Sequence, residues 1–226
     1  PRRHTVNLVR PACHTLRPGS LPHVTLLSRS ERRLSQMINP SLNRLAHDLL
    51  VDLSLPLLKI RLTESEGDAS IYDFGVNISG SLEAGVLLAN ACLAGHGAAS
   101  LSHTQVNGTS WPAMQVVTDD PLKACLFSQY AGWKISVDKY FAMGSGPMRA
   151  VAAREELFEK LNYKEESDRV LGVLETGVLP TDAVVNYIAD RCQVSPTNVT
   201  LLVAPTSSVA GTMQVVARSV ETAMHK

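Results

Sequence analysis

From residue 41 onward, segments whose apolar residues have the spacing of a helix are followed by segments whose apolar residues have the spacing of a strand. After Ser41, a good N-cap residue, leucine and alanine recur at the i, i+3, i+4 and i+7 spacing of an amphipathic helix that should end near Pro56. A second helix over 81–93 is almost wholly apolar. We therefore expect this second helix to be buried rather than laid on a surface.

The same pattern, with its turn signals, predicts that strands and helices alternate along the rest of the chain. The predicted strands are 70–76, 101–106, 111–118, 134–141, 169–175 and 198–204, with a hairpin turn at Asn107-Gly108 between the second and the third. The predicted helices run from Pro121 to about Tyr130 with Asp120 as N-cap, onward from about Met148, from Thr181 to Cys192, and onward from near Ser207. Such an alternation indicates an α/β protein with layered sheets.

Two stretches bear on domain organisation. The charged stretch 154–169 is either a crossing between two subdomains or the solvated face of a helix. The chain stops inside its last predicted helix, so we expect the sequence to be incomplete at its C-terminus.

The first 36 residues differ in composition from the rest, with seven arginines, no lysine, a single acidic residue and no apolar periodicity. An arginine-rich, acid-poor start is typical of an organelle transit peptide. We favour a disordered or non-native N-terminal extension over 1–36, because Met37 stands just before the first clear helix signal.

Composition narrows the class of protein. Residues 37–226 are mildly acidic, so they offer no basic field for nucleic acid. No run of about 18 apolar residues that could span a membrane occurs, nor a secretory signal core. The cysteines form no C-x-x-C pair, and most stand in apolar helical patterns, which favours buried, reduced thiols of a cytoplasmic protein. They are Cys13, Cys92, Cys125 and Cys192.

The last predicted helix carries a polar face. Gly211, Gln214, Arg218 and Glu221 fall within about 80° of one another at 100° per residue. Arg218 and Glu221 are i, i+3 neighbours and can pair. Such a pair is either an exposed ion pair worth a few tenths of a kcal/mol or a functional one. The first interpretation is the more common one, but the scarcity of other charges on the helix and the Ser/Thr-rich turn before it weaken it.

A short glycine loop, Gly144-Ser145-Gly146-Pro147, follows the predicted strand 134–141. It fits neither a Walker loop nor a dinucleotide fingerprint, so it is either a turn that cradles a ligand or an ordinary tight turn. The histidines are scattered without zinc-site spacing, and no G-x-S-x-G elbow occurs. An acid–base mechanism without metal or cofactor is what remains.

From about Ser41 to Lys226 the chain resembles the methenyltetrahydromethanopterin cyclohydrolases. The most specific matching segment is the run 137–147, and shorter segments match in the same order. These are Asp73-Phe-Gly-Val-Asn77, Gly80-Ser-x-x-Ala-Gly85, Ala131-Gly-Trp133, Leu174-Glu175 with Leu179-Pro180, Leu202-Val-Ala-Pro-Thr206 and Arg218-x-Val-Glu-Thr-Ala223.

The resemblance implies a two-domain α/β protein with mixed sheets flanked by helices, a pocket between the domains, and assembly as a homotrimer. The implied reaction is hydrolysis of the cyclic methenyl bridge of 5,10-methenyltetrahydromethanopterin to 5-formyltetrahydromethanopterin. It belongs to the one-carbon metabolism of methanogens and methylotrophic bacteria. Glu221 is the implied catalytic carboxylate, and Arg218 orients it. The expected substrate contacts are Gly144, Ser145, Gly146, Thr206, Ser207 and Gln214.

Two other functions stay open at this point. One is a non-catalytic pterin- or phosphate-binding protein on the same scaffold. The other is an unrelated α/β enzyme that handles phosphate through the Gly144 loop. Loss of methenyl absorbance on mixing with the pterin separates the first from the cyclohydrolase, and nucleotide titration tests the second.

Overall fold

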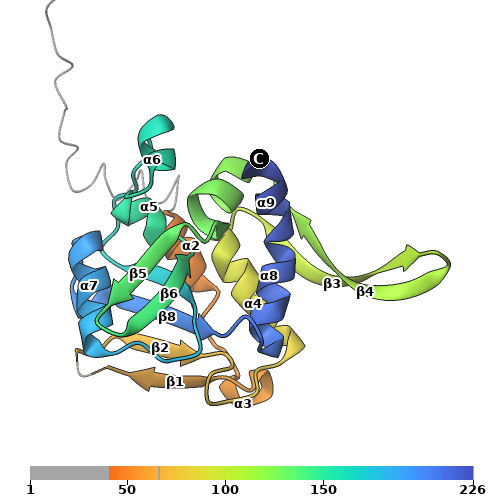
Figure 1. Ribbon diagram of the computed structural model, residues 1–226, viewed down its shortest axis with the longest axis horizontal. Helices are drawn as coiled ribbons and strands as arrows, with labels where there is room; N and C mark the ends of the chain where they lie inside the picture. Colours follow the sequence, from red (N-terminus) through yellow and green to blue (C-terminus); the bar gives the residue numbers. More distant parts are fainter. Residues whose placement is uncertain (1–40, 66, 226) are drawn as a thin grey trace, which may run out of the picture.

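The computed structural model describes residues 41–65 and 67–225, so the predicted extension over 1–36 lies outside the described residues. A six-stranded mixed sheet forms the centre, in the order β1-β2-β8-β7-β6-β5 (Figure 1). Strands β2, β8 and β7 are parallel to one another, and the outer strands are antiparallel to their neighbours. The strands are β1 (Arg61–Glu64), β2 (Ser70–Asp73), β5 (Trp133–Val137), β6 (Tyr140–Ser145), β7 (Val170–Glu175) and β8 (Val199–Ala204).

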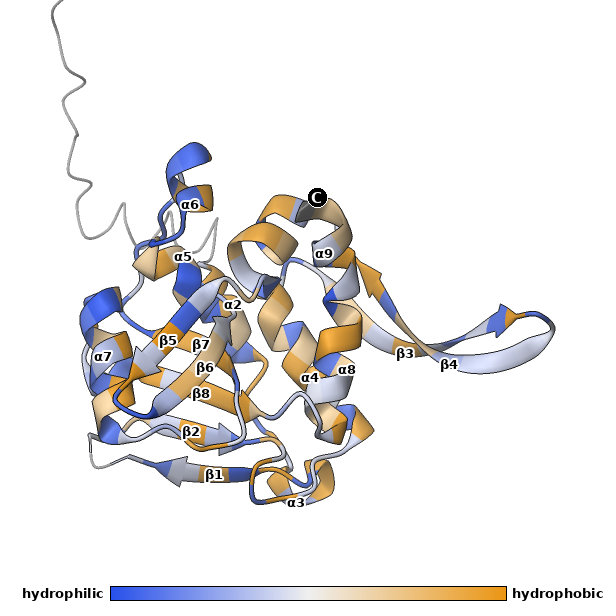
Figure 2. Cartoon of the chain, in the orientation of Figure 1, coloured by the Kyte–Doolittle hydropathy of each residue, from blue (hydrophilic) through white to orange (hydrophobic). Residues whose placement is uncertain are grey.

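Helices flank both faces of this sheet, which confirms the predicted α/β class. They are α2 (Leu42–Asp48), α3 (Leu55–Leu58), α4 (Leu82–Leu93), α5 (Met148–Ala152), α6 (Glu156–Lys160), α7 (Asp182–Cys192), α8 (Val209–Ala217) and α9 (Ser219–His225), with a π-helix η1 (Leu122–Gln129) and a 3₁₀ turn η2 (Pro196–Asn198). Helix α7 packs on one face, and α2 and α4 pack on the other. Apolar residues gather in β8 and α4, whereas α6 is largely hydrophilic (Figure 2).

The two central strands are largely apolar, apart from Thr200 in β8 and the final residue of β7, because both of their faces are covered. In β7, Leu171 and Val173 face α4 and α2, while Val170 and Leu174 face α7. Strand β8 alternates in the same way. The final residue of β7, Glu175, is the exception to this apolar run.

Helix α4 is buried, as its apolar composition predicts. The hydroxyl of Ser81 caps its start by accepting the Ala84 N–H at 3.0 Å. Helix α8 approaches α4 closely at Gly85, where an added Cβ would lie 2.5 Å from the Met213 Cβ and 3.2 Å from the Ala210 Cα. Glycine at this position therefore sets the spacing of the two helices.

We expect Gly85→Val to destabilise the fold by about 1–3 kcal/mol, because α4 and α8 must separate to admit the side chain. Urea unfolding measures the change in the free energy of unfolding. Gly177→Val is the control, since a Cβ at Gly177 has no atom within 4 Å. Equal stability of the two variants would contradict this account of the helix spacing.

The predicted hairpin is confirmed and is longer than predicted. Strands β3 (Ala98–Val106) and β4 (Thr109–Val117) pair along their full length and project from the rest of the fold (Figure 1). Asn107 and Gly108 both have positive φ, 52° and 79°. These values suit the two-residue turn that matches the twist of paired strands.

Several predicted boundaries are wrong. The predicted strand 134–141 is two strands, because the chain reverses at Asp138, whose φ is 52°. The first helix ends at Asp48 rather than near Pro56, and the helix over 122–129 is a π-helix. The last helix is capped by Ser208, whose hydroxyl accepts the Gly211 N–H at 3.1 Å.

Three of the four cysteines fall within the described residues, and all three are free and buried, as predicted. They are Cys92, Cys125 and Cys192. Cys13 lies outside the described residues. Over 41–65 and 67–225, no helix is both long and apolar enough to cross a membrane.

Candidate active site

Arg218 and Glu221 stand where α8 gives way to α9. Arg218 keeps a helical backbone, and the Thr222 N–H donates to its carbonyl oxygen at 3.1 Å, so one polar face continues across the junction. The Glu221 side chain is only 2% exposed, and its Oε2 lies 4.0 Å from the Arg218 Nε. The pair is therefore not an exposed surface ion pair.

A second carboxylate belongs to this cluster. The Arg218 Nη1 donates to the Oε1 of Glu175, the last residue of β7. The Arg218 side chain is 18% exposed and that of Glu175 10%, so the guanidinium is the most open part of the cluster. Ligand groups in α/β proteins gather at the carboxyl ends of parallel strands, where Glu175 stands.

Sequence reasoning named Glu175 as part of a family motif and did not place it in the site. The available signal was a single carboxylate that closes an otherwise apolar strand. Such a residue is buried at a sheet end, where its charge needs a partner. The sequence did not reveal that this partner is Arg218.

A chain of weaker contacts extends from the same helix face. The Gln214 Nε2 donates to the Cys92 Sγ at 3.5 Å, and the Cys92 Sγ lies 3.6 Å from the Ser145 Oγ. Burial raises the pKa of the Cys92 thiol to about 11, so the thiol is neutral at pH 7. The structure thus brings Gln214 and Ser145, both predicted site residues, next to the arginine and its carboxylates.

The glycine loop lies beside this cluster, but its backbone is largely used inside the protein. The Gly146 N–H donates to the Ser128 carbonyl oxygen at 2.8 Å, and Gly146 has a φ of 87°. Gly144 pairs with Leu174 and Trp133 within the sheet. The Gly146 N–H is therefore not available to a ligand in this structure.

Two other predicted contact residues lie elsewhere. Thr206 and Ser207 are exposed at the start of α8. About 18 Å of helix separates Val209 from Glu221, at 1.5 Å per residue. The structure therefore does not bring Thr206 and Ser207 to the Arg218–Glu221 pair.

Within the described part of the chain, no three His, Cys, Asp or Glu side chains come together as a metal site would require. The Arg218 cluster itself combines one cation with two carboxylates. Its chemistry is that of proton transfer and of attraction to positively charged ligands.

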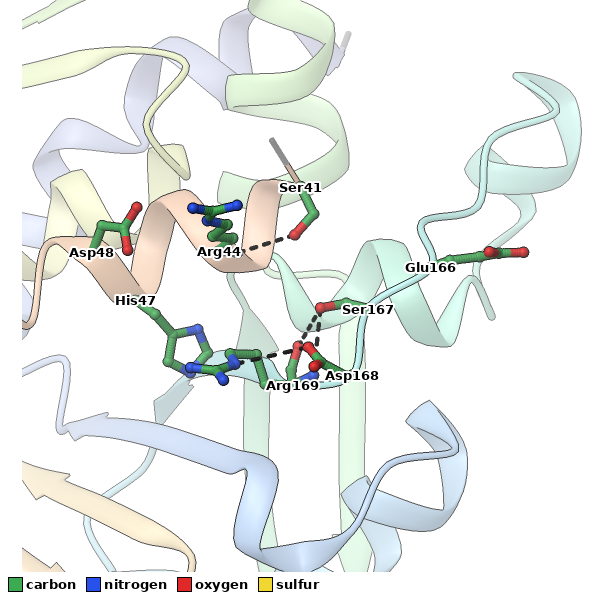
Figure 3. A pocket seen from close by; sticks show the side chains of 8 residues that line it. All are labelled: Ser41, Arg44, His47, Asp48, Glu166, Ser167, Asp168 and Arg169. Carbon is green, nitrogen blue, oxygen red and sulfur yellow. Dashed lines mark hydrogen bonds and ion pairs between the residues drawn. The ribbon is translucent and has the colours of Figure 1, made fainter. Parts of the chain in front are cut away.

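A separate hollow of about 290 Å³ lies between α2 and the segment 166–169, and it is lined by none of the residues of the Arg218 cluster (Figure 3). On one wall, the His47 Nδ1 lies 2.7 Å from the Asn43 carbonyl oxygen and donates to it. The His47 Nε2 lies 3.1 Å from the Thr200 hydroxyl, which donates to it when the ring is neutral. These two contacts suit a neutral imidazole.

Burial lowers the pKa of His47 below its ordinary value of 6.5, and the charge of Arg169 acts in the same direction. The Asn43 carbonyl, Asp48 and Asp168 oppose this shift without reversing it. As pH falls through about 6.5, this histidine therefore takes up a proton more readily in the unfolded chain than in the folded chain. The histidine thus lowers the free energy of unfolding as pH falls.

We expect the free energy of unfolding to fall less between pH 7.5 and pH 5.5 in His47→Asn than in the parent chain. Urea unfolding at a series of pH values measures this difference. His103→Asn, at an exposed position of β3, is the matched control and should keep the parent slope. A His47→Asn curve parallel to the parent curve would contradict the assignment of a neutral buried imidazole.

Fold and site together define a class: an α/β protein that holds one arginine between two largely buried carboxylates, an arrangement suited to acid–base chemistry. Comparison with known proteins is more specific. The family model described as Cyclohydrolase (MCH) matches residues 41–226. The chain therefore belongs to the MCH cyclohydrolase family.

Three similar proteins bear the name methenyltetrahydromethanopterin cyclohydrolase. The protein of Methanosarcina mazei is 47% identical over 170 residues, which cover 75% of this chain and 53% of the relative. That of Xanthobacter autotrophicus is 45% identical over 75% of this chain and 50% of the relative. That of Methylobacillus flagellatus is 40% identical over 87% of this chain and 61% of the relative. The chain thus spans about half to three fifths of the length of these relatives.

Proposed function

We propose that this chain carries the acid–base centre of a methenyltetrahydromethanopterin cyclohydrolase. The reaction is hydrolysis of the cyclic methenyl bridge of 5,10-methenyltetrahydromethanopterin to 5-formyltetrahydromethanopterin. The observation that carries the proposal is the buried carboxylate of Glu221, next to the guanidinium of Arg218. Membership of the cyclohydrolase family supports it.

The proposed mechanism uses one carboxylate twice. The methenyl carbon bridges two nitrogens as an amidinium-type cation, so it is already electrophilic. Glu221 takes a proton from water as the water oxygen bonds to this carbon. It then returns the proton to the nitrogen whose bond to the carbon breaks, and the added hydroxyl releases its proton to bulk water as the formyl C=O forms. One well-placed carboxylate suffices for both transfers.

Arg218 has two tasks in this scheme. Its positive charge favours the ionised form of Glu221, and its position fixes the direction of the carboxylate. Arg218 itself is held by Glu175. The three groups sum to one negative charge, which attracts a cationic methenyl ring and repels an anionic one.

The proposal also includes the location of the substrate pocket, the assembly and location of the protein, and its substrate contacts. The substrate pocket lies between two layered domains, with 154–169 as the crossing and 37–226 as one family region. The protein acts in the cytoplasm as a homotrimer and needs no metal or cofactor, since the carbon to be attacked is already activated. Ser145, Gln214, Gly144 and Gly146 stand close to the substrate, and Thr206 with Ser207 bind its distant polar tail.

The test is direct. Mixing the purified chain with 5,10-methenyltetrahydromethanopterin should bleach the methenyl absorbance far faster than buffer does, with the 5-formyl compound as product. Binding without bleaching would refute the catalytic role and favour a pterin-binding protein on the same scaffold. Absence of both binding and bleaching in a folded sample would refute the pterin assignment itself.

A further inference from the structure

The last two residues of the π-helix η1 carry polar side chains that make no hydrogen bond. Ser128 and Gln129 are both fully buried. The Ser128 hydroxyl and both polar atoms of the Gln129 carboxamide lack a hydrogen-bond partner among the described residues. Each buried polar group left in this state costs about 1–3 kcal/mol. A π-helix is rare, and where it occurs it frequently marks a functional site.

Helix η1 lies between the two parts of the proposed site. On one side it packs against α9, which carries Glu221. Cys125, one turn before Gln129, is close enough to Glu221 for the carboxylate charge to add to burial in raising the pKa of its thiol. On the other side, the Ser128 carbonyl oxygen accepts the N–H of Gly146. Helix η1, which carries the two unpaired side chains, therefore adjoins both the helix of Glu221 and the glycine loop.

The backbone of this segment is held firmly, so the lack of partners is not the result of a loose turn. The buried Arg149 donates from Nη1 to the carbonyl oxygens of Leu126 and Ser128, at 3.1 and 3.3 Å. Its Nε donates to the Glu155 Oε1 at 2.8 Å, and its guanidinium lies 5.0 Å from the centre of the Tyr130 ring. A rigid backbone that presents unpaired polar groups is a preorganised binding surface.

We propose that Ser128 and Gln129 form a polar subsite for the pterin ring of the substrate, a role that rests on the proposed function. A carboxamide offers one donor and one acceptor side by side. The pyrimidinone ring of a pterin offers the complementary pair, a ring N–H next to a carbonyl. Gln129 and Glu221 are both buried, and they stand on helices that pack against each other, η1 and α9.

The experiment measures the dissociation constant of tetrahydromethanopterin, which lacks the methenyl bridge and cannot react, by fluorescence titration of the full chain. Gln129→Met keeps the length of the side chain and removes both polar atoms. We expect this variant to bind tetrahydromethanopterin about tenfold to a hundredfold more weakly, as the loss of two hydrogen bonds implies. Its resistance to urea should equal or exceed that of the parent, since two unpaired polar groups are gone.

Two further variants keep the test decisive. Gln115→Met, at an exposed position of β4, is the matched control and should bind as the parent does. Ser128→Ala removes only a hydroxyl and should weaken binding severalfold, and it decides the matter if Gln129→Met does not fold. Parent-like binding by both subsite variants would overturn the subsite while leaving the proposed function intact. A folded parent chain that binds no tetrahydromethanopterin would overturn both.

Discussion

Glu221→Gln is expected to lower kcat for hydrolysis of 5,10-methenyltetrahydromethanopterin by about 10²- to 10⁴-fold, the range for loss of a general acid–base group. Glutamine has nearly the same shape but cannot accept the proton of the attacking water. The fold should survive, because Arg218 keeps its contact with Glu175 and is not left as an unpaired buried charge.

The measurement is the rate of methenyl absorbance loss under saturating substrate, with circular dichroism as the check on folding. Glu159→Gln is the control, since Glu159 is exposed on α6. A Glu221→Gln protein with a kcat near that of the parent would eliminate this carboxylate as the proton carrier. Loss of activity in the Glu159→Gln control would show that the assay responds to charge in general.

Arg149→Met should destabilise the fold by about 3–5 kcal/mol, the usual result of removing one partner of a buried ion pair. Arg149 is 1% exposed and pairs with Glu155, and it donates to two carbonyl oxygens of η1. Methionine fills much of the same volume, so the loss reports the charge and the hydrogen bonds rather than a cavity. This guanidinium therefore joins α5 to the backbone of η1.

Urea unfolding monitored by tryptophan fluorescence gives the free energy of unfolding for this variant. Arg154→Met changes the same residue type at an exposed position five residues on, and should stay within about 0.5 kcal/mol of the parent. If Arg149→Met were as stable as Arg154→Met, the buried pair would contribute nothing to the fold.

Sequence patterns were sufficient where one local rule decided the structure. The predicted strands 169–175 and 198–204 are confirmed as β7 and β8, whose mainly apolar sequences suit strands that are covered on both faces. Asn107-Gly108 predicts the hairpin, since these residue types adopt positive φ readily. Ser81 predicts the start of α4 through the hydrogen bond of its cap.

Sequence patterns failed where tertiary contacts determined the structure. The consecutive polar residues Asp138 and Lys139 interrupt the alternation at the reversal between β5 and β6, but this short break was not interpreted as a turn. The π-helical winding of 122–129 also leaves no trace in residue types. For the candidate site, the helical period brought Gln214, Arg218 and Glu221 together correctly. It did not reveal Glu175, whose approach depends on how the sheet packs against α8 and α9.

Strand order has a consequence for synthesis of the chain. Strand β2 pairs with β8, so Ile71 meets Leu201 roughly 130 residues downstream. Contacts this distant in sequence raise the contact order and slow folding. During synthesis the edge of β2 that pairs with β8 stays open until β8 has emerged from the ribosome. In this interval the exposed strand edge is most prone to aggregation.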